Sequence, residues 1–110
     1  MILIFKNEEF PVDKQGYLLD FTLWEHDLGE QMAKADNFQL STEHWEIINF
    51  VRNFYITYNT SPAIRALTKA MKAEFGEDKS SSRYLFRLFP DGPAKQATKY
   101  AGLPKPARCL

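Results

Sequence analysis

Cysteine is almost absent from this chain: Cys109 is the only one, and His26 and His44 are the only histidines. A single thiol cannot form an internal disulfide, and this usage is typical of proteins from a reducing compartment. Three such residues also cannot supply the four cysteine and histidine ligands of a structural zinc site. We therefore expect a cytoplasmic protein without a disulfide framework or a structural zinc site.

Long apolar runs and nucleotide-binding motifs are lacking as well. No stretch approaches the roughly 18 apolar residues that a membrane helix needs, and the N-terminal MILIFKNEEF does not read as a secretion signal. Neither GxxxxGK(S/T) nor GxGxxG occurs, and the histidines form no HExxH pair. The adjacent carboxylates Glu8 and Glu9 fall in an expected turn. We expect no membrane span, no bound cofactor and no self-contained active site.

Apolar and aromatic residues are plentiful, at 45% and 15% of the 110 residues, as is typical of one folded domain. Their spacing predicts a mainly α (α+β) fold with about five helices, the most apolar of which, at residues 41–58, should be central. Two of the helices, at residues 61–75 and 80–89, resemble a helix-turn-helix element. The expected elements are a hairpin from residues 2–5 and 10–12 and helices near residues 22–35, 41–58, 61–75, 80–89 and 93–101.

Capping signals set most of these helix starts. Thr22-Leu23-Trp24-Glu25 has the form of a capping box for the first helix. Ser41 or Thr42 is the expected cap of the second, and Ser61-Pro62 reads as the cap and first residue of the third. Gly29 is expected to weaken the first helix, because glycine has a low helix propensity.

Charge is divided unevenly along the chain although the net charge is zero. Residues 1–46 carry three Lys/Arg against ten Asp/Glu, giving −7, and residues 47–110 carry eleven against four, giving +7. Such a division can mark a surface for anionic partners. The alternative, that folding interleaves the two halves into a compensated surface, stays open at this point.

The last eighteen residues, PAKQATKYAGLPKPARCL, predict a short helix followed by an extended arm. Pro93 suits the first helical position, and Gly102 suits the left-handed position just past the helix end. Two further prolines favour an extended chain beyond Gly102. The seven residues from Leu103 to Cys109 would then reach about 20 Å at roughly 3.1 Å per residue. We expect an arm of residues 103–110 that presents a thiol to another protein.

Cys109 is the candidate nucleophile, because the thiolate is the reactive form of cysteine. Nearby positive charge favours the thiolate, and the terminal carboxylate opposes it. The alternative is an inert, buried cysteine, which a position near a chain end behind prolines disfavours. The basic residues of this stretch are candidates for guiding partner docking, although each has an ordinary solvated role as its alternative: Lys95, Lys99, Lys105 and Arg108.

Four stretches of the chain resemble the DsrC/TusE family of small sulfur-trafficking proteins: GYL, HWEIINFVRNFY, NTSPAIRALTKAM and SRYLFRLFPDGPAKQATKYAGLPKPARCL. The resemblance covers essentially the whole chain. Family members that work with dissimilatory sulfite reductase carry a second cysteine in the arm, at the position of Thr98 here. The chain therefore is similar to the one-cysteine branch of the family.

This resemblance implies that Cys109 is a sulfur carrier in a relay, not a stand-alone enzyme. It implies that the thiol accepts a persulfide sulfur from a TusBCD-like complex. The sulfur would then pass to an MnmA-like tRNA 2-thiouridylase, with tRNA as the final acceptor, for wobble 2-thiouridine synthesis. The covalent sulfur is the only cargo implied, and no separate cofactor or metal is expected. The family fold implied is one mostly helical domain, residues 1–110.

Two other functions stay open from the sequence. One is a DsrC-like partner of sulfite reductase, which the missing second cysteine disfavours. The other is nucleic-acid binding through the helix-turn-helix-like pair, with Lys79, Arg83 and Arg87 facing phosphates. Helix-turn-helix geometry is also a common way to pack two helices, and the connection here is longer than the usual turn.

Overall fold

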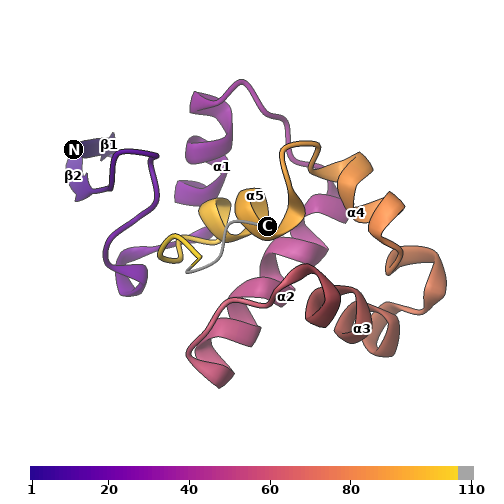
Figure 1. Ribbon diagram of the computed structural model, residues 1–110. Coiled ribbons are helices and arrows are strands. Elements are labelled where there is room, and N and C mark those ends of the chain that lie inside the picture. Colours follow the sequence, from indigo (N-terminus) through magenta and orange to yellow (C-terminus); the bar gives the residue numbers. More distant parts are fainter. Residues whose placement is uncertain (107–110) are drawn as a thin grey trace.

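The computed structural model describes residues 1–106, and this part of the chain folds into five helices, a two-stranded hairpin and two short 3-10 turns. Figure 1 shows the helices gathered around α5, with the hairpin at one side. The expected mainly helical fold with an N-terminal hairpin is confirmed. The elements in chain order are β1 (Ile2–Phe5), β2 (Glu8–Pro11), η1 (Phe21–Leu23), α1 (His26–Ala35), α2 (Thr42–Tyr58), α3 (Ile64–Phe75), η2 (Glu77–Lys79), α4 (Ser82–Leu88) and α5 (Pro93–Tyr100).

The hairpin turns at Lys6 and Asn7, which both have positive φ angles of 51° and 63°. Two consecutive left-handed residues form the tight turn whose twist suits antiparallel strands. β1 and β2 pair from Phe5 opposite Glu8 to Ile2 opposite Pro11. Phe10, on one face, is buried in the core. The predicted hairpin is confirmed, but Glu8 and Glu9, which were expected in the turn, belong to β2.

The short helix α5, not α2, occupies the centre of the fold. It contacts α1, α2, α3 and α4, as Figure 1 also shows. Ala94, Ala97 and Ala101 are almost fully buried, and such small side chains let neighbouring helices approach closely. The expectation that α2 is central is wrong, because this 17-residue helix runs past the core and leaves Ile56 and Tyr58 exposed near its end.

The start of α1 differs from the expected capping box. The Asp20 carboxylate accepts hydrogen bonds from the Thr22 backbone N–H at 3.0 Å and the Thr22 hydroxyl at 2.6 Å. These bonds close η1, so Thr22 is not available as a cap, and α1 begins at His26. Acidic side chains compete for nearby backbone donors in this way.

Of two further helix starts, one lies where the sequence predicts it and one lies later in the chain. Ser41 caps α2 as expected, and the His44 ring Nδ1 completes a reciprocal capping box at 3.0 Å from the Ser41 backbone nitrogen. α3 begins at Ile64 and not at Pro62, because the backbone of Ala63 is still extended. None of the helices in residues 1–106 is both long and apolar enough to cross a membrane.

Gly29 has a packing role that helix propensity does not reveal. A Cβ atom at this position would lie 2.7 Å from the Tyr100 carbonyl oxygen and 3.0 Å from the Trp45 ring. The missing side chain therefore lets α1 come close to the end of α5. Glycine is required here by the neighbouring helix, although it lowers the stability of its own helix.

Gly29→Ala is predicted to destabilise the protein, although helix propensity alone would predict that alanine stabilises it. Propensity favours alanine by about 1 kcal/mol, whereas overpacking costs about 1–3 kcal/mol. Urea denaturation measures the net effect, and Gln31→Ala compared with Gln31→Gly calibrates propensity in the same helix. A Gly29→Ala variant more stable than the native protein would contradict the close approach.

Candidate functional site

The base of the C-terminal arm is built into the core. Leu103, the first residue of the expected arm, has no exposed surface, and Pro104 and Pro106 are half-buried. Lys105 is exposed. Cys109 and Arg108, the candidate nucleophile and one docking residue, lie outside the described residues. What the structure defines is the base from which the thiol is carried.

The turn after α5 ends the helix with a pair of backbone hydrogen bonds. The N–H of Leu103 donates to the Thr98 carbonyl at 3.2 Å, and the N–H of Gly102 donates to the Lys99 carbonyl at 3.1 Å. Gly102 has a φ angle of 71°, as this type of helix end requires. The sequence prediction for Gly102 is confirmed. The motif turns the chain sharply and leads Leu103 into the core.

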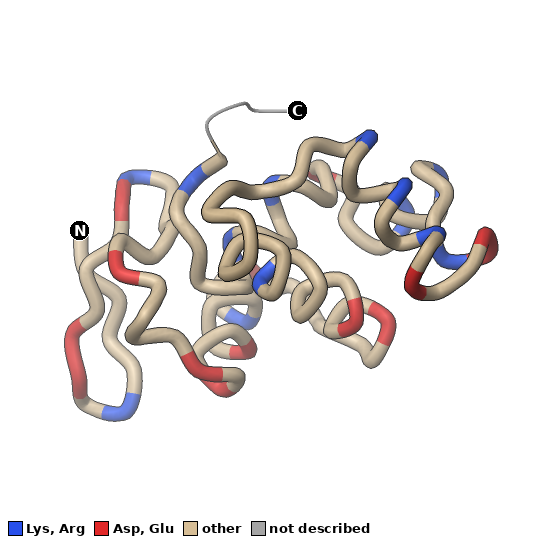
Figure 2. Tube along the Cα trace, turned by 90° about the horizontal axis from the view of Figure 1, so that it is seen from below, with Lys and Arg blue, Asp and Glu red and all other residues tan. Residues whose placement is uncertain are grey.

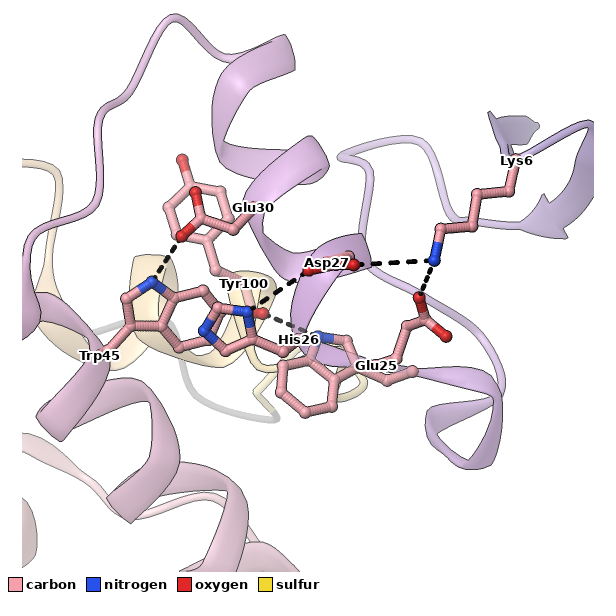
Figure 3. Close-up of polar contacts among 8 residues, drawn as sticks. Lys6, Glu25, His26, Asp27, Glu30, Trp45 and Tyr100 are labelled. Carbon is pink, nitrogen blue, oxygen red and sulfur yellow. Dashed lines mark hydrogen bonds and ion pairs between the residues drawn. The ribbon is translucent and has the colours of Figure 1, made fainter.

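Two side chains from other segments cover the carbonyl groups that α5 leaves exposed. The Trp24 indole Nε1 donates to the Tyr100 carbonyl at 2.9 Å, and Arg52 Nη1 donates to the Ala101 carbonyl at 2.8 Å. Figure 3 shows Tyr100 beside the aromatic layer in which His26 lies over Trp45, with ring centroids 3.8 Å apart. Sequence reasoning missed Trp24 as a site residue, because only the tertiary fold brings it to α5. For Arg52 the sequence favours a core-flanking or salt-bridge role over a partner-selecting one, and its two carbonyl contacts depend on the tertiary fold.

The three predicted docking lysines come together on one side of the arm base. Lys95, Lys99 and Lys105 line a cleft of about 540 Å³, which Asp36 and Tyr100 also line. A second cleft of about 340 Å³ lies against the arm base, between the loop of residues 59–63 and Pro104–Pro106. The arm therefore leaves the core between two clefts.

The three lysines differ in their surroundings. Lys99 Nζ lies 2.8 Å from the Asp36 carboxylate, and only 20% of its side chain is exposed. The Tyr100 hydroxyl donates to the same carboxylate oxygen at 2.9 Å. Within residues 1–106, neither Lys95 nor Lys105 forms an ion pair. Lys99 thus already has a carboxylate partner in the free protein, which ties α5 to the end of α1.

The acidic and basic halves of the sequence are partly interleaved by folding. Lys79 of the basic half pairs with Glu46 of the acidic half at 3.0 Å, as Lys99 does with Asp36. Figure 2 shows acidic positions along the hairpin and the segment that follows, and a concentration of basic positions at the end formed by α3 and α4.

Of the residues proposed for nucleic-acid contact, Lys79 is engaged with Glu46 and Arg87 lies over the Tyr84 ring. Among the described residues there is no group of three or more metal-binding side chains.

Ionisation of the Tyr100 phenol makes the stability of the fold depend on pH. Burial, and then the hydrogen bond to Asp36, raise the pKa of the Tyr100 phenol well above its ordinary value. Because the folded-state pKa is the higher one, the neutral phenol stabilises the fold fully below the unfolded-state pKa of about 10. That stability is lost as the pH rises above about 10.

Tyr100→Phe is predicted to remove part of this alkaline loss of stability. At neutral pH the variant should be less stable by about 1 kcal/mol through the lost hydrogen bond. Above pH ~10 the difference from the native protein should shrink, because the native protein loses this contribution. Urea denaturation of the two proteins between neutral and alkaline pH measures the stability difference at each pH. A difference that stays the same at all pH values would contradict a raised pKa of the Tyr100 phenol.

Thr98, on α5, is fully buried. Its hydroxyl has no hydrogen-bond partner in the described part of the chain, and it lies on the buried side of α5. A buried polar group without a partner lowers stability.

Thr98→Val is therefore predicted to leave the protein equally stable or to stabilise it by up to about 1 kcal/mol, because valine has nearly the same shape. The control is Thr68→Val, whose hydroxyl donates to the Arg65 carbonyl at 3.0 Å. Thermal denaturation compares the two variants. A clear loss of stability in Thr98→Val alone would show that the hydroxyl is hydrogen-bonded.

Comparison with known proteins places this geometry in a family. Sulfurtransferase TusE of Salmonella typhimurium is 56% identical over 109 residues, covering 99% of this chain and all of the relative. Sulfurtransferase TusE of Escherichia coli is 55% identical over the same coverage. The NMR structure of Allochromatium vinosum DsrC has a TM-score of 0.89 at 46% identity, with full coverage of both chains.

A second solved structure agrees with the first. The oxidized gamma-subunit of the dissimilatory sulfite reductase (DsrC) from Archaeoglobus fulgidus has a TM-score of 0.87 at 37% identity, again over both whole chains. The family model described as DsrC like protein matches residues 4–110. The resemblance read from the sequence is confirmed, and this chain belongs to the DsrC-like family.

Proposed function

We propose that this protein is a sulfur carrier that holds a persulfide sulfur on Cys109 between two partners. The observation that carries the proposal is the full-length identity of 55–56% to proteins named sulfurtransferase TusE, in a chain with a single cysteine. The donor would be a TusBCD-like complex. The acceptor would be an MnmA-like tRNA 2-thiouridylase in the cytoplasm, with tRNA as the final recipient.

The anchored arm base supports a carrier role. A carrier must present one atom deep inside two different hosts, which favours a narrow extended segment over a pocket. Leu103 fixes the start of the segment in the core, and prolines restrict the chain that follows. Restricted chains lose less conformational entropy on insertion than glycine-rich ones, so docking is less costly.

The chemistry proposed is thiol exchange in two steps. The Cys109 thiolate attacks the outer sulfur of the donor persulfide, a new S–S bond forms to Cys109, and the donor S–S bond breaks. The donor leaves as a thiolate, which takes up the proton released from the outer sulfur. In the second step a nucleophile of the acceptor attacks the outer sulfur, and the Cys109 thiolate leaves. Neither step needs an oxidant or a reductant.

Basic residues around the arm would guide docking by favouring anionic surfaces and the anionic form of the sulfur. Lys95 and Lys105 flank the arm base in the larger cleft, and Arg108 stands next to the thiol in the sequence. Lys99, already paired with Asp36, would contribute through the same cleft after that pair opens. Their effect should weaken with added salt, as it does for exposed charges generally.

Thr98 favours the carrier over a sulfite reductase partner. The two-cysteine chemistry needs a thiol at this position, and a buried threonine cannot form a disulfide. Nucleic-acid binding by α3 and α4 is the remaining alternative, and a salt-sensitive duplex complex weakened by Arg83→Ala and Arg87→Ala would support it.

Loading of Cys109 tests the proposal. The protein is incubated with a cysteine desulfurase, L-cysteine and the TusBCD-like complex, and its intact mass is measured. The native protein should gain one sulfur atom, which a thiol reductant removes. Cys109→Ser should gain none and should abolish tRNA thiolation in a reconstituted assay, with an unchanged melting temperature.

Two results would contradict the proposal. One is sulfur gain or tRNA thiolation that persists in Cys109→Ser. The other is a large loss of stability in Cys109→Ser, which would identify the cysteine as structural. Arg83→Ala is the matched control. Arg83 is an exposed residue of α4, outside the arm, and its replacement should leave the sulfur loading of Cys109 unchanged.

A further inference from the structure

The end of the molecule formed by α3 and α4 carries basic side chains that the fold leaves without a charged partner (Figure 2). Arg65 and Lys69 are four residues apart, so they share one face of α3, and both are exposed. Arg83 is exposed on α4. Within residues 1–106, none of these three side chains forms an ion pair. Their charges are therefore available to an anionic partner.

Other basic residues of this end are already engaged within the protein. Lys72 Nζ lies 3.1 Å from the Glu77 carboxylate, and Lys79 Nζ lies 3.0 Å from the Glu46 carboxylate. The charge of these two lysines is compensated in the free protein. The three residues without an ion pair are thus the ones that can neutralise an added anion.

A cleft of about 410 Å³ between the two helices brings hydroxyl groups beside one of these free charges. Its lining residues are Ile64, Arg65, Thr68, Ser80, Ser81 and Ser82. None of these described residues carries a carboxylate. Arginine and hydroxyl side chains are common partners of phosphate oxygens in nucleic-acid complexes. The cleft therefore suits a phosphate group, which Arg65 would neutralise.

An exposed aromatic ring lies on the same helix as Arg83. Phe86 is 43% exposed, whereas every other phenylalanine of the chain is partly or fully buried. Phe86 follows Arg83 by three residues, so the two side chains are neighbours on the surface of α4. An aromatic ring beside positive charge is the arrangement on which unpaired nucleic-acid bases stack.

We propose that this α3/α4 surface, made of Arg65, Lys69, Arg83, Phe86 and the hydroxyl-lined cleft, binds RNA. The basic residues and the hydroxyl groups contact phosphates, and Phe86 stacks on a base of a single-stranded loop. The choice of tRNA as the RNA rests on the proposed sulfur-carrier function, in which tRNA is the final recipient of sulfur. The phosphate and base contacts themselves do not depend on that function.

The arrangement favours an RNA loop over duplex DNA. A recognition helix reads a duplex with polar side chains that reach base edges in the major groove. α4 has seven residues, and the exposed Phe86 ring on it has no group that can hydrogen-bond to a base edge. Stacking needs a base that is already outside a duplex, which the loops of a tRNA supply.

The α3/α4 surface adjoins the base of the arm. Ala63 and Pro104 line the cleft beside the arm base, and the next residue, Ile64, lines the hydroxyl-lined cleft. An RNA bound at the α3/α4 surface would therefore lie near the point where the arm leaves the core. Binding of the carrier to both thiolase and RNA would raise its effective concentration at the acceptor.

Binding of a tRNA transcript with a wobble uridine tests the phosphate contacts, by fluorescence anisotropy over a series of salt concentrations. The native protein should bind with a Kd of roughly 1–100 μM near physiological salt, as is typical of phosphate contacts. Arg65→Gln/Lys69→Gln should weaken the complex. It should also reduce the slope of log affinity against log salt by about two, which is about one for each lost phosphate contact.

The matched control is Lys14→Gln/Lys34→Gln, which removes the same charge from two exposed lysines on other parts of the surface. Neither lysine forms an ion pair within residues 1–106. The control should keep the native salt slope. Equal losses in the control and in Arg65→Gln/Lys69→Gln would overturn the proposed site, and so would a native protein that binds no tRNA at low salt.

Phe86→Leu tests the base contact, because leucine keeps an apolar side chain but has no flat ring. It should weaken tRNA binding at least about fivefold without changing the salt slope, since no phosphate contact is lost. Tyr58→Leu, which replaces an exposed aromatic residue of α2, should leave the affinity unchanged. An unchanged affinity in Phe86→Leu would overturn the stacking contact.

A DNA duplex of equal charge separates RNA binding from general binding of polyanions. The duplex should bind more weakly than tRNA, and Phe86→Leu should not change its affinity. A duplex bound as tightly as tRNA would overturn the assignment to RNA. Sulfur loading of Cys109 is measured without RNA. A native protein that binds tRNA in this way but takes up no sulfur would therefore sink the proposed carrier function and leave the RNA site standing.

Discussion

The capping of the α5 carbonyl groups is the interaction on which this structure depends. The backbone turn at Gly102, the Trp24 indole and the Arg52 guanidinium satisfy groups that would otherwise be buried without partners. An unsatisfied buried carbonyl costs about 1–3 kcal/mol. The three partners come from the residues just after α5, from the segment before α1, and from α2. One helix end therefore joins most of the fold.

The rest of the core is arranged so that these partners can reach α5. Alanines on α5 and Gly29 on α1 remove side-chain volume where backbones approach. The Asp36 carboxylate, at the end of α1, then accepts from both Lys99 and Tyr100. Close packing on one side and a charged contact on another hold a helix that is only eight residues long. A helix of that length is not stable alone, so its geometry comes from its neighbours.

Much of this was accessible from the sequence, because it depends on local signals. The hairpin, the Ser41 cap, Pro93 at the start of α5 and Gly102 at its end follow from short-range preferences, and the structure confirms them. Other features could not be predicted, because they depend on which segments meet. The central place of α5 and the carbonyl contacts of Arg52 are of this kind.

One wrong prediction and one missed role show how local competition and tertiary contacts act beyond what a motif indicates. Thr22 has the right spacing for a capping box, but Asp20 is closer and takes its donors. Gly29 looks like a weak point of its helix, whereas its missing Cβ makes room for the Tyr100 carbonyl. Of the site residues, Lys95, Lys99 and Lys105 converge on one cleft, which the sequence could not show. The roles of Cys109 and Arg108 stay predictions, since they lie outside the described residues.

The central claim is that one sulfur atom passes through Cys109 on an anchored arm. A single-turnover chase tests it most directly: protein loaded with radioactive sulfur is purified, mixed with thiolase and tRNA, and diluted with excess unlabelled donor. Our account predicts that the label leaves the protein and appears in thiolase and then tRNA despite the dilution. Label that stays on the protein, or tRNA that acquires only unlabelled sulfur, would contradict it.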